Sequence, residues 1–107
     1  MMIVFTFIET TQFTRLVKEY LSDDELRELQ ATLIESPESG DVIPGSGGVR
    51  KLRWRAAGRG KRGGYRVIYF VRLASDEVWL ITIYPKNIAD KIPADVLKKI
   101  RREIEHG

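Results

Sequence analysis

The stretch VRKLRWRAAGRGKRGGYRVIYFVR, residues 49–72, decides how this chain folds and carries half of its basic residues. It holds nine of the eighteen Lys and Arg residues, and no Asp or Glu occurs between Val42 and Ser75. Because cations at this density repel one another, the stretch predicts an anionic partner. A basic hairpin that only aids solubility is the alternative, but charge asymmetry of this kind favours nucleic acid.

The first part of the stretch, residues 49–55, has the pattern of a β-strand. Apolar Leu52 and Trp54 alternate with basic residues, and successive side chains along a strand point to opposite faces of the sheet. The cations therefore form a row on the face opposite the core, at a spacing of about 6–7 Å. These cations are Lys51, Arg53 and Arg55.

The second part of the stretch, residues 65–73, is apolar on both faces and predicts a central, buried strand. Arg66 and Arg72 interrupt it. Between the two strands lies AAGRGKRGG, which contains four glycines and three cations. This composition predicts a flexible basic turn that is suited to phosphate contacts.

The residues before this stretch predict a strand, a helical hairpin and a loop. Residues 2–8 are apolar on both faces, which indicates an inner strand of the sheet. Thr10 or Thr11 caps a first amphipathic helix, and a second helix begins after Ser22, where SDDE has the capping-box pattern. Pro37 ends that helix, and the loop that follows lacks the Lys-Ser/Thr ending of a nucleotide-binding loop.

The residues after the stretch predict one more strand, 77–84, which follows a turn at Ser75 and Asp76 and which Pro85 closes. Strict alternation assigns its side chains to two faces. One face takes Val78, Leu80, Thr82 and Tyr84, and the other takes Trp79, Ile81 and Ile83.

A final helix begins near Pro93, because proline is tolerated in a first turn. The resulting order, β-α-α-β-β-β-α, predicts an α+β fold in a single domain, residues 1–107. The sheet is expected to be small and antiparallel-dominated, with an N-terminal α-hairpin and a C-terminal helix. The inward stripe of that last helix is Val96, Leu97, Ile100 and Ile104.

The composition excludes several kinds of site. The chain has no Cys and a single His, His106, so we expect no disulfide, no thiolate chemistry, no metal site and no His-based triad. The apolar start, MMIVFTFI, is too short to span a membrane and lacks the basic region of a signal peptide. We therefore expect a cytoplasmic protein with no membrane partner.

The element order and three segments together resemble the RelE/HigB-type toxins of type II toxin–antitoxin systems, within the RelE/ParE superfamily. The resemblance extends from about residue 4 to residue 104 and is strongest to the HigB branch. The segments are GDVIPGSGGVRKLRW (40–54), GKRGGYRVIYF (60–70) and LITIYPKN (80–87).

The resemblance implies a ribosome-dependent mRNA endonuclease, or mRNA interferase, which inhibits translation by cutting the codon in the A site. No metal or other cofactor is implied. The 2′-OH of one nucleotide attacks the adjacent phosphate, which leaves a 2′,3′-cyclic phosphate and a free 5′-OH. Such a reaction needs cations around the phosphate, a proton acceptor and a proton donor. The implied partners are the ribosome, mRNA and a HigA- or RelB-like antitoxin, a helix-turn-helix protein.

The resemblance also implies roles for individual residues. Lys51 and Arg53 correspond to the residues that hold the phosphate and activate the nucleophile, and Arg66 to the arginine that stabilises the transition state. Lys86 falls at the position of a proposed general acid. The expected catalytic set is Lys51, Arg53, Arg66, Tyr84 and Lys86. The expected RNA-binding set is Arg50, Arg55, Arg59, Lys61 and Arg62.

The general base is the point where the chain departs from the family pattern. The position of the tyrosine proposed for this role falls near Ile92, which has no titratable group. Tyr84, at the end of a strand, is a candidate substitute, and a buried core aromatic is its alternative role. A lysine whose pKa is lowered by cationic neighbours is a further candidate.

Two other functions fit the same resemblance. A ParE-like inhibitor of DNA gyrase shares the fold and acts by binding a protein, and a non-catalytic relative would bind RNA without cutting it. ParE-type chains generally lack the basic set of the interferases. The combination of Lys51, Arg53, Arg66 and Lys86 therefore counts against the gyrase inhibitor.

Overall fold

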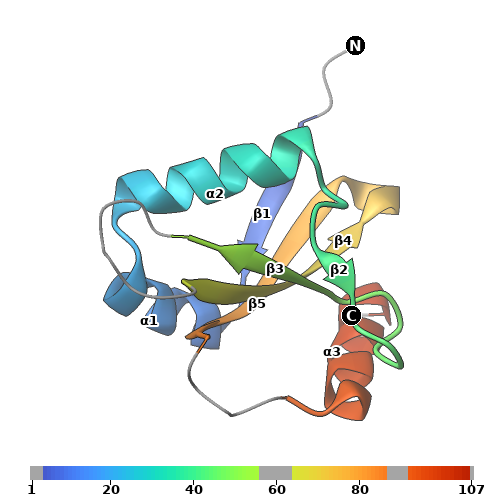
Figure 1. Cartoon of the computed structure of the whole chain (residues 1–107). Coiled ribbons are helices and arrows are strands. Elements are labelled where there is room, and N and C mark those ends of the chain that lie inside the picture. Colours follow the sequence, from blue (N-terminus) through green and yellow to red (C-terminus); the bar gives the residue numbers. More distant parts are fainter. Residues whose placement is uncertain (1–3, 56–63, 87–91, 107) are drawn as a thin grey trace.

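The computed structural model describes residues 4–55, 64–86 and 92–106 (Figure 1). One five-stranded sheet has the order β1-β5-β4-β3-β2, in which β1 and β5 pair parallel and the other three pairs are antiparallel. The predicted α+β fold with an antiparallel-dominated sheet is confirmed. Its elements are β1 (Thr6–Glu9), α1 (Thr11–Tyr20), α2 (Asp23–Glu35), β2 (Asp41–Val42), β3 (Arg50–Trp54), β4 (Tyr65–Arg72), a 3-10 turn (Leu73–Ser75), β5 (Glu77–Pro85) and α3 (Ala94–His106).

Helices cover both faces of the sheet, and α2 and α3 lie on opposite sides of it in Figure 1. On the face that we call the α1/α2 face, Phe13 and Leu33 pack with buried residues of the strands. On the other face, which we call the α3 face, Leu97 and Ile104 pack against the sheet. The sheet residues of the α1/α2 face include Leu52, Tyr65, Val67, Tyr69, Val78, Leu80 and Ile83, and those of the α3 face include Ile68, Phe70 and Ile81.

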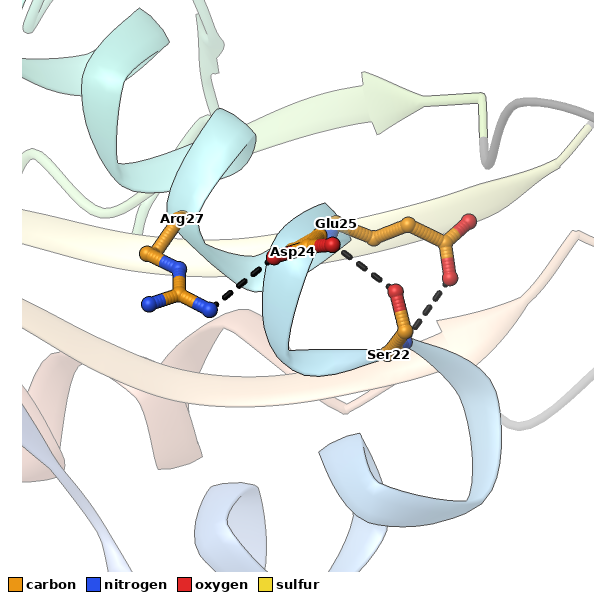
Figure 2. Close-up of polar contacts among 4 residues, drawn as sticks. All are labelled: Ser22, Asp24, Glu25 and Arg27. Carbon is orange, nitrogen blue, oxygen red and sulfur yellow. Dashed lines mark hydrogen bonds and ion pairs between the residues drawn. The ribbon is translucent and has the colours of Figure 1, made fainter.

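Side-chain caps start the first two helices, as the sequence predicts. The Thr10 hydroxyl accepts a hydrogen bond from the Phe13 backbone N–H (3.1 Å) and donates one to the Ile81 carbonyl oxygen (2.6 Å). Figure 2 shows the capping box of α2, in which the Ser22 N–H donates to Glu25 Oε1 (2.8 Å) and the Glu25 N–H donates to Ser22 Oγ (3.1 Å). These bonds satisfy backbone donors that the first turn of a helix leaves without partners.

The first strand lies at the edge of the sheet, so its predicted inner position is wrong. β1 pairs with β5 from Thr6 to Glu9, and β2 forms the opposite edge. Phe5 and Phe7 pack against the α1/α2 core, whereas Val4 is 72% exposed. An apolar strand sequence therefore does not show how many neighbouring strands it has. The short strand β2 is a second departure, because its two residues lie in a segment predicted as a loop.

β5 contains a β-bulge that changes the direction of its last side chains. Ile68 of β4 lies opposite Thr82, whereas the next residue, Tyr69, lies opposite Leu80, so Ile81 is an extra residue on β5. Such an insertion shifts the alternation of faces by one residue. The prediction that Ile81 shares a face with Trp79 is confirmed, and the predicted faces are wrong from Thr82 onward. Ile83 packs in the α1/α2 core, and Tyr84 packs against the α3 core.

The predicted stripe of α3 is confirmed in part. Leu97 and Ile104 are buried and Ile100 is half-buried, but Val96 is 40% exposed, so its predicted inward position is wrong. Residues that follow one another in a helix point about 100° apart, so a neighbour of buried Leu97 falls at the margin of the stripe.

The C-terminal end of α3 is fixed to the turn between β4 and β5. Arg72 donates to the Glu105 carbonyl oxygen (3.3 Å) and lies 3.6 Å from the Glu77 carboxylate. The Trp79 indole N–H also donates to that carboxylate (3.0 Å), and this hydrogen bond lowers the pKa of Glu77 below its ordinary value. Arg72 therefore joins the last turn of α3 to the ends of β4 and β5.

Tyr69 at the centre of β4 anchors the segment between α2 and β2. Its side chain is fully buried; its hydroxyl donates to the Pro37 carbonyl oxygen (2.8 Å) and accepts from the Gly40 N–H (2.9 Å). Both bonds connect positions about thirty residues apart along the chain. They therefore determine where β2 joins the sheet.

We predict that Tyr69→Phe lowers the free energy of unfolding by about 1–3 kcal/mol, because it leaves the buried Gly40 N–H without an acceptor. Urea denaturation measures this change. Tyr20→Phe is the matched control, since that half-buried ring packs against the Tyr65 ring (5.1 Å between centroids) and phenylalanine keeps this contact. Equal losses of stability in the two variants would contradict the anchoring role.

Candidate nucleic-acid interface and active site

A row of facing residues crosses three strands on the α3 face. Arg53 of β3 lies directly opposite Arg66 of β4, which lies opposite Tyr84 of β5. Facing residues of antiparallel strands have Cβ atoms about 4.5–5.5 Å apart. Like charges at this distance are unfavourable, and an anion bound between them lowers that cost. The row therefore has the arrangement of an anion site on a rigid sheet.

The row continues into a basic hollow of about 170 Å³ at the ends of the strands. Gly64 shapes this end, because its φ is +61° and a Cβ there would collide with the Trp54 carbonyl oxygen. The Gly64 carbonyl oxygen accepts a hydrogen bond from the Lys86 N–H (3.1 Å), which fixes Lys86 beside β4. The hollow is lined by Arg53, Trp54, Arg55, Arg66 and Lys86.

Lys51 lies next to this row and lines a second hollow, of about 80 Å³, on the α3 face. Tyr84, Ile92 and Leu97 contribute to its walls, together with Ile43 from the loop before β3 and with Ile68. The buried Ser46 hydroxyl holds that loop, since it donates to the Ile43 carbonyl oxygen (2.6 Å) and accepts from the Val49 N–H (3.0 Å). Lys51 thus stands at the border between the cationic row and an apolar cradle.

Asp41 is a residue that the sequence analysis did not assign to the site. The register of β2 and β3 places Asp41 directly opposite Lys51, and facing residues share one face of the sheet. Both side chains are exposed. A carboxylate therefore enters the neighbourhood of the cations from an edge strand. Two residues of a predicted loop carry no strand pattern, so this pairing has no signal in the sequence.

Tyr84 has a perturbed acidity. Burial raises the pKa of Tyr84 above its ordinary value near 10, and the positive charge of Arg66 opposes that shift with a smaller effect. The hydroxyl is therefore protonated at neutral pH and can donate a hydrogen bond. A raised pKa disfavours its use as a proton acceptor, the role that the sequence analysis considered for it.

The RNA-binding set of the sequence analysis divides into three groups. Arg55 lines the basic hollow. Arg50 lies opposite Tyr69 on the α1/α2 face, where its guanidinium donates to the Gly40 (2.7 Å) and Glu38 (3.3 Å) carbonyl oxygens. Arg50 is thus separated from the catalytic set and supports the loop before β2. The remaining three, Arg59, Lys61 and Arg62, lie outside the described residues.

Neither a metal site nor a membrane helix emerges from the part of the chain that the structure describes. Within residues 4–55, 64–86 and 92–106, no three His, Cys, Asp or Glu side chains gather as a metal would require. No helix in those same ranges has the length and apolar character needed to cross a bilayer.

We predict that the phenol of Tyr84 titrates above pH 10 and that Arg66→Ala raises its pKa further, because the variant removes the charge that opposes the effect of burial. Tyrosine-labelled NMR, with Tyr84→Phe to assign the signal, measures both values. Lys98→Ala, an exposed position on α3, should leave the titration unchanged. A titration at or below the ordinary value, or no response to Arg66→Ala, would contradict this environment.

This chain is similar to known RelE toxins. A family model described as the RelE toxin of the RelE/RelB toxin–antitoxin system matches residues 4–106. A mutant of the E. coli toxin RelE in the free state is similar in structure, with a TM-score of 0.62 and 16% identity over 91% of this chain and 96% of that chain.

Two further solved structures are similar. The intact E. coli RelBE toxin–antitoxin complex has a TM-score of 0.59 and 18% identity, over 79% of this chain and 100% of that chain. The isolated E. coli RelE toxin has a TM-score of 0.57 and 18% identity, over 94% and 99%. At these identities the structural matches establish the fold alone. The family model matches residues 4–106, nearly the whole chain, and so shows the family.

Proposed function

We propose that this chain, which belongs to the RelE toxin family and is the toxin of a toxin–antitoxin module, is a ribosome-dependent mRNA endonuclease. It would stop translation in the cytoplasm by cutting mRNA in the A site. The observation that carries this proposal is the pairing of Arg53 with Arg66, which line one hollow together with Lys86. Assignment to the HigB branch stays a prediction.

The proposed reaction begins with the scissile phosphate in the basic hollow. Arg53 and Arg66 would bind its non-bridging oxygens, where negative charge increases in the transition state. The two guanidinium groups come from neighbouring strands of a packed sheet. They therefore need little reorganisation as the charge develops, which is the condition for efficient electrostatic stabilisation.

The proton transfers fall on the two sides of that phosphate. The 2′-oxygen forms a bond to phosphorus while the bond to the 5′-oxygen breaks, which gives a 2′,3′-cyclic phosphate and a 5′-OH. Lys86 is proposed to donate the proton to the leaving 5′-oxygen. Asp41, opposite Lys51, offers a carboxylate that could accept the proton of the 2′-OH, while protonated Tyr84 would donate a hydrogen bond.

We predict that Arg66→Ala and Lys86→Ala each reduce cleavage by about 100-fold or more, because each removes a charge-stabilising or proton-donating group. Primer extension on programmed ribosomes with purified protein measures the rate. Lys98→Ala, on the exposed face of α3, is the control and should cleave at nearly the normal rate. Circular dichroism checks that each variant is folded.

The same assay separates the alternatives. Cleavage at the wild-type rate by folded Arg66→Ala would remove Arg66 from the site, and the same reasoning applies to Lys86. Ribosome binding without new mRNA ends in the wild type would favour a non-catalytic RNA-binding relative. Inhibition of gyrase without any effect on mRNA would favour a ParE-like activity.

We also propose a RelB-type antitoxin as partner, one whose acidic or amphipathic segment covers the basic hollow. The similar E. coli RelE structure with RelB, and the density of cations on the α3 face, support this proposal. We expect association to slow as salt is added, because electrostatic steering is screened. Stopped-flow mixing with the product of the adjacent gene measures the rate.

A matched pair of variants tests the location of that partner. Arg55→Ala removes a cation of the hollow, whereas Arg27→Ala removes an exposed cation of α2 that pairs with Asp24 (2.9 Å). The first should slow association at low salt, and the second should not. An association rate that salt leaves unchanged, or equal slowing in both variants, would rule out this docking surface.

A further inference from the structure

A third hollow lies on the other side of Tyr84, between α1 and the last residues of β5. Its volume is about 210 Å³. A water molecule takes up about 30 Å³ in the liquid, so the space is much larger than a single water requires. α1 contributes Gln12, Leu16 and Tyr20 to its walls, and β5 contributes Thr82 and Tyr84.

The hollow exists because β1 covers only part of the edge of β5. β1 ends at Glu9, opposite Leu80, and the Thr10 hydroxyl then bonds to the Ile81 carbonyl oxygen as the chain turns into α1. Beyond that point α1 runs beside β5. The bulge at Ile81 then places Thr82 and Tyr84 on the α3 face, where the cationic row lies.

The walls combine apolar side chains with four side chains that carry polar groups, namely Gln12, Tyr20, Thr82 and Tyr84. Thr82 is only 2% exposed, and it lines the hollow. A threonine hydroxyl can donate one hydrogen bond and accept others, so a ligand edge that reaches it would be stabilised. The Gln12 side chain adds an amide, which can both donate and accept.

The position of the hollow connects it to the phosphate site. Tyr84 forms a wall of this hollow and of the Lys51 hollow, and it lies opposite Arg66 in the sheet. A group attached to a phosphate held by Arg66 could therefore enter beside Tyr84. Single-stranded RNA is commonly bound by unstacked bases that pack on aromatic side chains and form hydrogen bonds through their edges.

We propose that this hollow is a nucleobase subsite for the RNA substrate. One base next to the bound phosphate packs against Leu16 and Tyr20, and the Thr82 hydroxyl and the Gln12 amide bond to its edge. The inference rests on the proposed function in one respect, namely that the ligand is RNA. It adds a specificity determinant that lies outside the cationic set.

A binding experiment without ribosomes tests the subsite directly. The four nucleoside 3′-monophosphates are titrated into the methyl-labelled protein, with inorganic phosphate as the reference. Leu16 and Ile83 both line the hollow, so we expect their methyl signals to shift with the nucleotides and not with phosphate, and we expect a preference for one base. Thr82→Val replaces the hydroxyl with a methyl group of similar size and should weaken binding of the preferred nucleotide roughly 5- to 10-fold.

Two more variants control for misfolding and for effects that are not specific to the hollow. Gln12→Leu changes an exposed position of α1 and should alter base preference without loss of structure, whereas Thr11→Val, also exposed on α1, should change nothing. Shifts that are identical for phosphate and for all four nucleotides would overturn the proposal. So would methyl shifts caused by an antitoxin peptide but by no nucleotide, because the hollow would then be a protein-docking site.

Cleavage on programmed ribosomes separates this inference from the proposed function. Cleavage of mRNA by the wild-type protein, with a base preference at the cut site that Thr82→Val and Gln12→Leu both keep, would contradict the proposed subsite and support the proposed endonuclease activity. Base-selective binding of nucleotides at Thr82 without any cleavage of mRNA would contradict the endonuclease activity and support the subsite.

Discussion

The bulge at Ile81 is the constraint on which the site depends. One extra residue in β5 moves Thr82 and Tyr84 onto the α3 face, opposite Ile68 and Arg66. With regular pairing, the side chain of Tyr84 would point into the α1/α2 core. The cationic row would then have only two strands. The same insertion keeps Ile83 in the α1/α2 core, so both cores stay filled while one strand end serves the site.

The rigidity of the sheet fixes the positions of the cations of the site. Arg53 and Arg66 project from strands whose opposite face is packed with Leu52 and Val67, both buried under α1 and α2. Hydrophobic burial on that face offsets the cost of placing two like charges opposite each other. A loop could not hold guanidinium groups at a fixed spacing with so little freedom.

Two hollows share Tyr84 as a wall, and a third is lined by its cross-strand partner Arg66. The third, basic hollow is lined by four cations and Trp54, the Lys51 hollow has mostly apolar walls with one cation, and the hollow beside α1 combines apolar walls with an amide and hydroxyl groups. Tyr84 lines the last two and faces Arg66, so its environment is both buried and positively charged. Single-stranded RNA, in which every nucleotide carries a phosphate and a base, is complementary to these neighbouring surfaces.

The sequence alone determined the elements and the cationic strand, because these depend on local rules. The capping box at Ser22, the alternation around Leu52 and Trp54 and the apolar run of β4 all follow from residues close together in the chain. Only the tertiary structure decided the edge position of β1, the pairing of Asp41 with Lys51 and the direction of Tyr84. The first depends on which distant strands pair, and the other two depend on the register of that pairing, in which one inserted residue reverses a face.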